Sequence, residues 1–326
     1  MSSSQKPYLI VIVGPTGVGK TEMAVELARE RNGEIISADS MQVYRFMDIG
    51  TAKPTDSQRQ QVRHHLIDVV NPDEHFNAAM FREMAAGVIS ALVNQHKTVF
   101  VVGGTGLYIK ALLGGLFAGP GGNESIRAFY RLELKRFGKA YLYEKLRKKD
   151  EQAAARIDRN DAVRIIRALE VLELSGESIV EKQKAHGFND RLYDCIKIGL
   201  TMERPLLYKK IEERSGKMVR DGLVDEVRRL LDMGYHENLK PMRSLGYKHM
   251  CSYVKGKRSI EDALKMMQRD TKRYAKRQVT WFGADKQIVW FSPQGIEEAR
   301  KYIDRFLGCE KYRDIKVLPG VQGTKL

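Results

Sequence analysis

The sequence predicts an α/β fold in which a doubly wound parallel sheet carries a helical insertion. Three observations predict it: apolar runs separated by stretches with helical spacing, a glycine-rich loop directly after the first apolar run, and a long segment that contains only helical patterns. Continuously apolar strands are typical of parallel sheets that helices cover on both faces. A chain of 326 residues has room for one large domain with a sizeable insertion, or for two domains.

The first apolar run, residues 8–13, leads into a phosphate-binding loop (the P-loop). This loop matches the pattern Gly-x4-Gly-Lys-Ser/Thr, and residues 21–31 after it have the spacing of an amphipathic helix. Its members are Gly14, Pro15, Thr16, Gly17, Val18, Gly19, Lys20 and Thr21. In such a loop the backbone N–H groups and the positive end of the helix bind phosphate oxygens, while Lys20 adds an ammonium group and Thr21 a hydroxyl ligand for Mg²⁺. Strand, loop and helix together predict a P-loop NTPase-like core that binds a diphosphate and uses Mg²⁺, but they do not select ATP as the ligand.

Further apolar runs are expected to extend the sheet. They lie at residues 34–39, 98–104, 194–200 and 287–291. Ligands of open α/β sheets bind at the carboxyl ends of the strands. Gly14, Asp39 and Gly103 all fall at that edge, so we expect the functional site there.

The segment from about residue 121 to residue 190 shows only helical patterns. Helices are expected at residues 125–137, 140–149 and 161–174, and turn-forming residues mark both ends of the segment. The sequence therefore predicts a P-loop catalytic core made of residues 1–120 and 191–326, with a helical C-terminal part, and a helical insertion at 121–190.

The charge of the chain is strongly positive and unevenly distributed. The net charge is +15, and residues 240–286 contain 13 Lys and Arg against 4 Asp and Glu, so they hold +9 of it. Five of these cations fall on one face of a predicted helix: Arg269, Lys272, Arg273, Lys276 and Arg277. Tyr274, Gln278 and Trp281 fall on a neighbouring face. A charged stripe is usually solvated surface, but beside a P-loop and in so basic a chain we favour contact with the phosphate backbone of a nucleic acid.

The cysteines and the apolar runs indicate in which cellular compartment the protein is expected. Cys195, Cys251 and Cys309 are far apart and form no Cys-x-x-Cys motif, which indicates neither a disulfide framework nor a zinc site. The first residues are too few and too polar for a signal peptide, and no apolar run is long enough to span a membrane. We expect a cytoplasmic protein without membrane contact, and nothing in the sequence requires more than a monomer.

Two polar residues at the expected sheet edge have alternative interpretations. Asp39 follows the second strand, where it could form an Asx turn or helix N-cap, or could face the P-loop as a general base or a water-mediated Mg²⁺ ligand. Thr105, in the second glycine cluster at residues 103–106, could simply cap a tight turn between strand and helix.

Six blocks of the sequence, taken in order, resemble one enzyme family. They read GPTGVGKT, SADSMQVYRFMDIGTAKP, HHLIDVVNPDEHF, VVGGTGLYIKALL, NDAVRIIRALEV and YAKRQVTWF. They are similar to the bacterial tRNA dimethylallyltransferases, from Leu9 to about Phe291. No Cys/His pair follows Phe291, so the bacterial type is favoured over relatives with a zinc-finger extension. The family transfers the dimethylallyl group of dimethylallyl diphosphate to N6 of the adenosine immediately 3′ of the anticodon in tRNA, and releases pyrophosphate.

The resemblance implies roles for the catalytic residues. The P-loop, with Lys20, would hold the diphosphate of the prenyl donor, and Arg214 would assist, with Arg220 and Arg243 as alternatives. Asp39 would accept the proton from N6, which a weakly nucleophilic amine releases as the new bond forms. Thr105 would line the reaction channel beside the same amine.

The resemblance also implies contacts to the anticodon stem-loop. Ser40, Met41 and Gln42 would meet the target nucleotide and its neighbours. In the insertion, the expected contacts are Arg127, Val163, Arg164, Ile165, Ile166 and Arg167. The charge of the basic stripe, apart from the resemblance, predicts that Lys272 and Lys276 contact the phosphate backbone.

Two other classes of protein share parts of this pattern. A nucleotide or small-molecule kinase would explain the P-loop and an acidic neighbour, but not the basic segment or the insertion. A P-loop ATPase that binds RNA without modifying it would need a metal-binding Asp at a strand end, for which Asp39 and Asp68 are the candidates.

Overall fold

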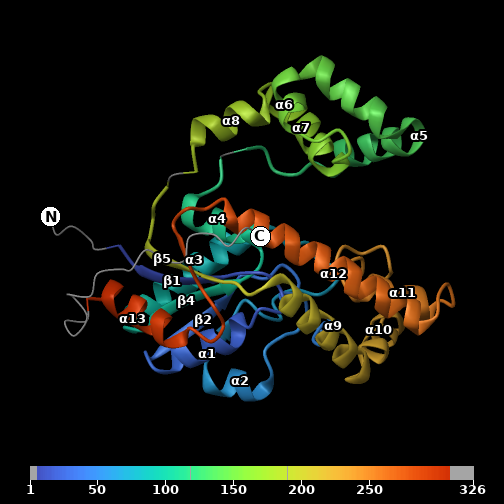
Figure 1. Cartoon of the computed structure of the whole chain (residues 1–326). Helices are drawn as coiled ribbons and strands as arrows, with labels where there is room; N and C mark the ends of the chain where they lie inside the picture. Colours follow the sequence, from blue (N-terminus) through green and yellow to red (C-terminus); the bar gives the residue numbers. More distant parts are fainter. Residues whose placement is uncertain (1–5, 118, 189, 309–326) are drawn as a thin grey trace. The chain divides into compact units, whose positions relative to one another are not determined.

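The computed structural model describes residues 6–117, 119–188 and 190–308, and the chain divides into two compact units (Figure 1). The first unit consists of Met1–Leu113 and Arg191–Leu326, and the second of Gly114–Asp190. The second unit begins at Gly114 rather than at residue 121 because its two ends run together. The Asp190 N–H donates to the Gly114 carbonyl at 3.4 Å, and a Cβ on Gly114 would lie 2.4 Å from the Phe188 carbonyl oxygen.

A parallel sheet forms the centre of the first unit. In the described part of the chain its six strands lie in the order β3-β2-β4-β1-β5-β6, and every pair is parallel. The strands are β1 (Tyr8–Val13), β2 (Gly33–Ser37), β3 (His64–His65), β4 (Thr98–Gly103), β5 (Asp194–Leu200) and β6 (Ile288–Phe291). The predicted doubly wound parallel sheet is confirmed. Only β3 is missing from the prediction, because it consists of two histidines and is too short to show the pattern of a strand.

Helices bury both faces of this sheet, and β1 shows how. Leu9, Val11 and Val13 belong to one apolar cluster and Ile10 and Ile12 to another, since successive side chains of a strand point to opposite faces. The strand is therefore apolar at every position, as expected for the middle of a parallel sheet. The helices of this unit are α1 (Lys20–Arg29), α2 (Asp56–Gln61), α3 (Ala78–Asn94), α4 (Gly106–Gly114), α9 (Arg204–Arg220), α10 (Leu223–Asp232), α11 (Tyr247–Val254), α12 (Ile260–Gly283) and α13 (Ile296–Phe306).

The second unit is helical and has a core of its own. Its helices are α5 (Glu124–Lys149), α6 (Glu151–Arg156), α7 (Ala162–Ser175) and α8 (Ile179–His186). The two helices expected at 125–137 and 140–149 are the halves of α5, which is broken at Gly138 with φ 82°. Tyr130, Leu142 and Leu169 are fully buried among its core residues.

None of the helices in the described ranges combines the length and the apolar character that a membrane span requires. Of the cysteines, Cys195 and Cys251 are free, and Cys309 lies outside the described residues.

Gly103, the last residue of β4, should tolerate no larger residue. A Cβ there would lie 2.1 Å from the Ala38 carbonyl oxygen, which is backbone and cannot turn aside. We expect Gly103→Ala to lower the free energy of unfolding by about 1–3 kcal/mol, as overpacking does. The measurement is urea unfolding followed by circular dichroism.

The matched control is Gly87→Ala in α3, where nothing lies within 4 Å of the added Cβ. In an exposed helix this change should raise the free energy of unfolding by about 0.5–1 kcal/mol. Equal effects of the two substitutions would contradict the close approach of β2 and β4.

Candidate active site

The P-loop joins β1 to α1 and adopts a shape that depends on glycine. Gly14, Gly17 and Gly19 have φ angles of 145°, 84° and 103°, a region that side chains disfavour. A Cβ on Gly14 would also lie 2.6 Å from the Leu200 carbonyl oxygen at the end of β5. The loop is therefore pressed against the sheet edge, and the N–H groups at the start of α1 face an anion that binds there, while the Thr16 N–H is bound to Gln278.

Lys20 lies within this loop as a poorly solvated cation. Its Nζ donates to the Gly14 and Pro15 carbonyl oxygens at 3.0 and 2.9 Å. Burial, and after it the neighbouring Arg214 guanidinium, lower the pKa of Lys20 to about 8, although Asp39 and Glu22 oppose the shift. An anion bound here would raise this pKa again, because it would favour the charged form.

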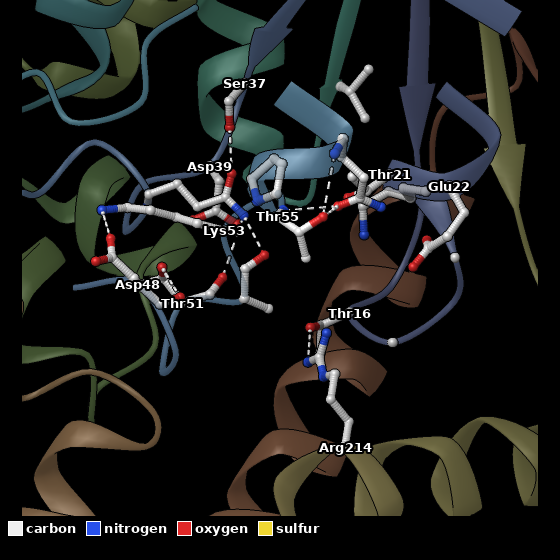
Figure 2. Close-up of a pocket in the computed structure, with 18 of the residues that line it drawn as sticks. Thr16, Thr21, Glu22, Ser37, Asp39, Asp48, Thr51, Lys53, Thr55 and Arg214 are labelled. Atoms are coloured by element: carbon white, nitrogen blue, oxygen red, sulfur yellow. Dashed lines mark hydrogen bonds and ion pairs between the residues drawn. The ribbon is translucent and has the colours of Figure 1, made fainter. Parts of the chain in front are cut away.

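Arg214 reaches the same loop from α9. Its Nη2 donates to the Thr16 hydroxyl at 2.5 Å, as Figure 2 shows. Burial lowers the pKa of Arg214 as well, against the fields of Glu22 and Asp39. Two cations thus converge on one P-loop in surroundings that disfavour charge. Arg220 also lines the cavity, but among the described residues neither Arg220 nor Arg243 forms a hydrogen bond or ion pair with the P-loop.

Asp39 follows β2 at the same edge of the sheet (Figure 2). Its Oδ1 accepts the N–H groups of Met41 and Gln42 at 2.8 and 3.3 Å, which is the Asx turn that sequence analysis offers as one interpretation. Its carboxylate also lines the cavity in front of the P-loop and raises the pKa of Lys20. The turn therefore fixes the orientation of a carboxylate that faces the two cations.

Thr105 is held between three neighbours. Its N–H donates to the Ala38 carbonyl at 3.1 Å, its Oγ1 accepts the Ser40 N–H at 3.0 Å, and it shares a hydrogen bond with the Tyr274 hydroxyl. Thr105, Ser40 and Met41 are absent from the residues that line the cavity, whereas Gln42 is present. The Gln42 amide, however, is engaged with the Ser37 hydroxyl and two carbonyl groups of its own loop.

One cavity of about 1610 Å³ opens in front of these residues. It is larger than the roughly 300–1,000 Å³ typical of small-ligand sites. The P-loop, Asp39 and Arg214 line one part of it, and most of the residues from Arg45 to Arg59 line another. It has room for a diphosphate together with a second, larger group.

The wall formed by residues 48–50 depends on a buried carboxylate. Glu226 of α10 accepts the N–H groups of Asp48, Ile49 and Gly50 at 2.9, 2.8 and 3.1 Å, and the Tyr247 hydroxyl at 2.6 Å. This residue is 1% exposed. Sequence reasoning missed it, because an isolated Glu in an amphipathic helix looks like a surface residue.

Lys53 and Asp68 stabilise the same wall and do not form a metal site. The Lys53 ammonium is buried and contacts the Tyr44 carbonyl at 2.7 Å, Asp48 at 2.6 Å and Asp68. The other oxygen of Asp68 accepts from Arg59 at 3.2 Å. Among the residues that the structure describes, no group of three or more His, Cys, Asp or Glu could hold a metal ion.

Gln278 of α12 is a second residue that sequence reasoning missed. It is 5% exposed, its Oε1 accepts the Thr16 N–H at 2.8 Å, and its Nε2 donates to the Gly104 carbonyl at 2.9 Å. The sequence signal that could have identified Gln278 is its position on one helix face with Tyr274 and Trp281, next to the basic stripe.

The basic stripe of α12 borders a groove, which we name the α9–α12 groove. Its volume is about 430 Å³. It is lined by Arg204, Tyr208, Lys265, Gln268, Arg269, Lys272, Arg273 and Lys276. Lys272 contacts Glu212 and lies 5.4 Å from the centre of the Tyr208 ring. Arg277, the fifth member of the predicted stripe, lies outside the groove and over the Tyr274 ring.

In the second unit the expected RNA contacts divide into exposed and buried residues. Val163 is 79% exposed and Ile165 fully buried. Ile166 is buried as well. The side chains of Ile165 and Ile166 therefore belong to the core of this unit, and Val163 and Arg164 are the accessible members.

Arg127 and Arg167 of this unit both bind one buried carboxylate. Arg127 Nε lies 2.8 Å from Glu170 Oε1 and Arg167 Nη1 lies 2.6 Å from Glu170 Oε2. Their hydrogen bonds lower the pKa of Glu170 against the effect of burial. These arginines thus have a structural task within the unit.

The sequence matches known proteins along almost its whole length. A family model described as IPP transferase matches residues 42–285. The tRNA dimethylallyltransferase 2 of Syntrophus aciditrophicus is 56% identical over 308 residues, which cover 94% of this chain and 99% of that protein. The tRNA dimethylallyltransferase 2 of Geotalea uraniireducens is 50% identical over 290 residues, which cover 89% of this chain and 94% of the relative.

Solved structures agree with this match. The full-length tRNA isopentenylpyrophosphate transferase of Bacillus halodurans is 40% identical, with a TM-score of 0.69 over 94% of this chain and 98% of that one. A eukaryotic dimethylallyltransferase acting on tRNA shares the fold, with a TM-score of 0.76 at 23% identity over 96% of this chain and 81% of that one. The family resemblance found in the sequence blocks is confirmed. This chain belongs to the IPP transferase family and is an enzyme of the transferase class.

Proposed function

We propose that this enzyme transfers the dimethylallyl group of dimethylallyl diphosphate to N6 of the adenosine immediately 3′ of the anticodon in tRNA. Pyrophosphate is the second product. The observation that supports this most directly is the meeting of two half-buried cations, Lys20 and Arg214, with the carboxylate of Asp39 at one end of a cavity larger than a diphosphate needs. We further propose that it works as a monomer in the cytoplasm.

The P-loop binds and stabilises the leaving group. As the bond between the prenyl C1 and the diphosphate oxygen breaks, negative charge spreads over pyrophosphate. The fixed N–H groups of the loop, the Lys20 ammonium and the Arg214 guanidinium face this charge at no cost of reorganisation. Their poor solvation in the free protein, expressed in the lowered pKa values of both groups, makes the interaction with an anion stronger.

Mg²⁺ fits this site as a partner of the diphosphate. Mg²⁺ usually keeps several waters and takes one or two protein ligands together with phosphate oxygens. The Thr21 hydroxyl lines the cavity and suits that role, and the described residues offer no all-protein cage. When bound, the ion neutralises charge on the phosphate oxygens.

Asp39 serves as the general base. The exocyclic N6 amine is a poor nucleophile, because its lone pair is delocalised into the ring, and it releases a proton as the C–N bond forms. The Asx turn leaves the orientation of the Asp39 carboxylate fixed toward the cavity. That carboxylate orients the amine and takes the proton.

The RNA is bound by its backbone and by the extruded base. The target adenosine leaves its stack to enter the cavity. Contacts from Gln42, which lines the cavity, and from Ser40, Met41 and Thr105, which adjoin its lining residues in the chain, offset the cost of unstacking. The α9–α12 groove, with Lys272 and Lys276, contacts the phosphate backbone. In the helical second unit Val163 and Arg164 contact the anticodon loop, with Arg127 and Arg167 beside them, and Ile165 and Ile166 support that helix from the core.

The kinase and ATPase alternatives are not favoured. Asp68, a candidate metal ligand for an ATPase, is engaged by Lys53 and Arg59. The basic groove also has no task in a small-molecule kinase. Incubation of the enzyme with unmodified tRNA and either labelled dimethylallyl diphosphate or labelled ATP separates the three activities. We expect label on tRNA only from the prenyl donor; hydrolysis of ATP without prenyl transfer would refute the proposal.

Asp39→Asn should slow the chemical step by at least about 100-fold, since a general base contributes 10²–10⁴-fold. The amide keeps an oxygen for the Asx turn, so the affinity for tRNA should stay within about threefold. Single-turnover rates and filter-binding affinities give the two quantities. Equal losses of rate and affinity would assign Asp39 a structural role.

The pKa of Lys20 predicts how pyrophosphate affinity depends on pH. In the free protein the ammonium is charged below a pKa of about 8 and neutral above it. A bound anion favours the charged form, so the contribution of Lys20 to the affinity should be constant below that pH and fall above it, by up to about tenfold per pH unit. Isothermal titration calorimetry with inorganic pyrophosphate measures this. Lys20→Gln is the control for the titration of pyrophosphate itself, and an identical slope in both proteins would contradict the assignment.

Replacement of Lys272 and Lys276 by Ala should weaken tRNA binding more at low salt than at high salt. Each lost phosphate contact lowers the slope of log affinity against log salt by about 1, so the double variant should lose about 2. Lys301→Ala, in α13 and outside the groove, is the matched control. An unchanged slope in the double variant would show that the groove is ordinary solvated surface.

A further inference from the structure

The helix face beside the basic stripe contacts the second glycine cluster at three successive positions. Tyr274 shares a hydrogen bond with Thr105, Gln278 donates to the Gly104 carbonyl, and Trp281 packs on Gly106, where a Cβ would lie 1.9 Å from its Nε1. These side chains are spaced as neighbours on one face of a helix. The close approach of α12 therefore explains Gly104 and Gly106, whereas Gly103 is explained by the Ala38 backbone.

Gln278 differs from its two neighbours because it contacts both loops of the site. Its Oε1 accepts the Thr16 N–H of the P-loop at 2.8 Å, and its Nε2 donates to the Gly104 carbonyl at 2.9 Å. An amide can accept from an N–H and donate to a carbonyl at the same time, whereas a carboxylate or an apolar side chain cannot. The side chain is 5% exposed, so water cannot readily replace it.

The two loops that Gln278 joins hold the two sides of the proposed reaction. Thr16 also accepts a hydrogen bond from Arg214, at the diphosphate end. Gly104 precedes Thr105, whose hydroxyl is bound to the backbone directly after Asp39, at the base end. The Gln278 amide thus links the loop that holds the leaving group to the loop beside the base.

We propose that Gln278 is a positioning residue, which holds the P-loop and the Thr105 turn at the spacing that prenyl transfer requires. The inference rests on the proposed function. Misplacement of reacting groups by about 1 Å can cost about 100-fold in rate. Loss of Gln278 therefore acts on turnover more than on the binding of either substrate.

Gln278→Met tests this, because methionine has a similar length but makes neither hydrogen bond. We expect kcat for prenyl transfer to fall about 10- to 100-fold per folded enzyme, while KM for dimethylallyl diphosphate and for tRNA stays within about threefold. Thr271→Val is the matched control: Thr271 is buried in the same helix and donates only to the Met267 carbonyl. Its kcat should stay within about twofold of the wild-type value.

Gly104→Ala disturbs the contact between Gln278 and Gly104 by changing the glycine. It provides the test if Gln278→Met does not fold. The added Cβ would lie 2.1 Å from Gln278 Nε2 and displace the amide. Because both substitutions break one contact, the double variant should be little slower than the slower single variant. A kcat of Gln278→Met within threefold of wild type, a parallel rise of KM, or additive losses in the double variant would each overturn the inference. Absence of prenyl transfer by the wild-type enzyme would instead refute the proposed function.

Discussion

The site depends on cations held where water solvates them poorly. Lys20 and Arg214 converge on the P-loop from α1 and α9, and burial lowers the pKa of both. The carboxylates of Asp39 and Glu22 offset only part of the desolvation of these cations. An anion with several oxygens, bound by the N–H groups of the loop, satisfies both cations together. A bound diphosphate therefore stabilises the charged forms of both side chains, whereas a neutral ligand does not.

The geometry of the sheet edge places these cations beside the other groups of the site. β1, β2 and β4 end side by side, and the absence of a Cβ at Gly14 and Gly103 lets the loops that follow pack against neighbouring backbone. The same edge brings the carboxylate of Asp39 to the P-loop. The carboxylate of Asp39, the two cations and the cavity therefore all lie where the strands β1, β2 and β4 end.

Buried polar side chains from distant helices fix the loops of the site. Glu226 gathers three backbone N–H groups of the cavity wall, Gln278 joins the P-loop to the Thr105 turn, and Lys53 closes the wall from within. Each of these side chains supplies hydrogen-bond partners to backbone groups that lie outside regular secondary structure. Loops with such anchors can present catalytic groups with little loss of conformational entropy on binding.

The sequence by itself determined the P-loop, the parallel sheet, the helical character of the insertion and the acidic residue after β2, because these depend on local patterns of apolar and glycine residues. It did not reveal Gln278 or Glu226, and it did not distinguish exposed Val163 from buried Ile165. Their roles arise from contacts across long sequence separations, 262 positions between Thr16 and Gln278. Local periodicity carries no information about such contacts, so only the tertiary structure decided which polar side chains hold the site together.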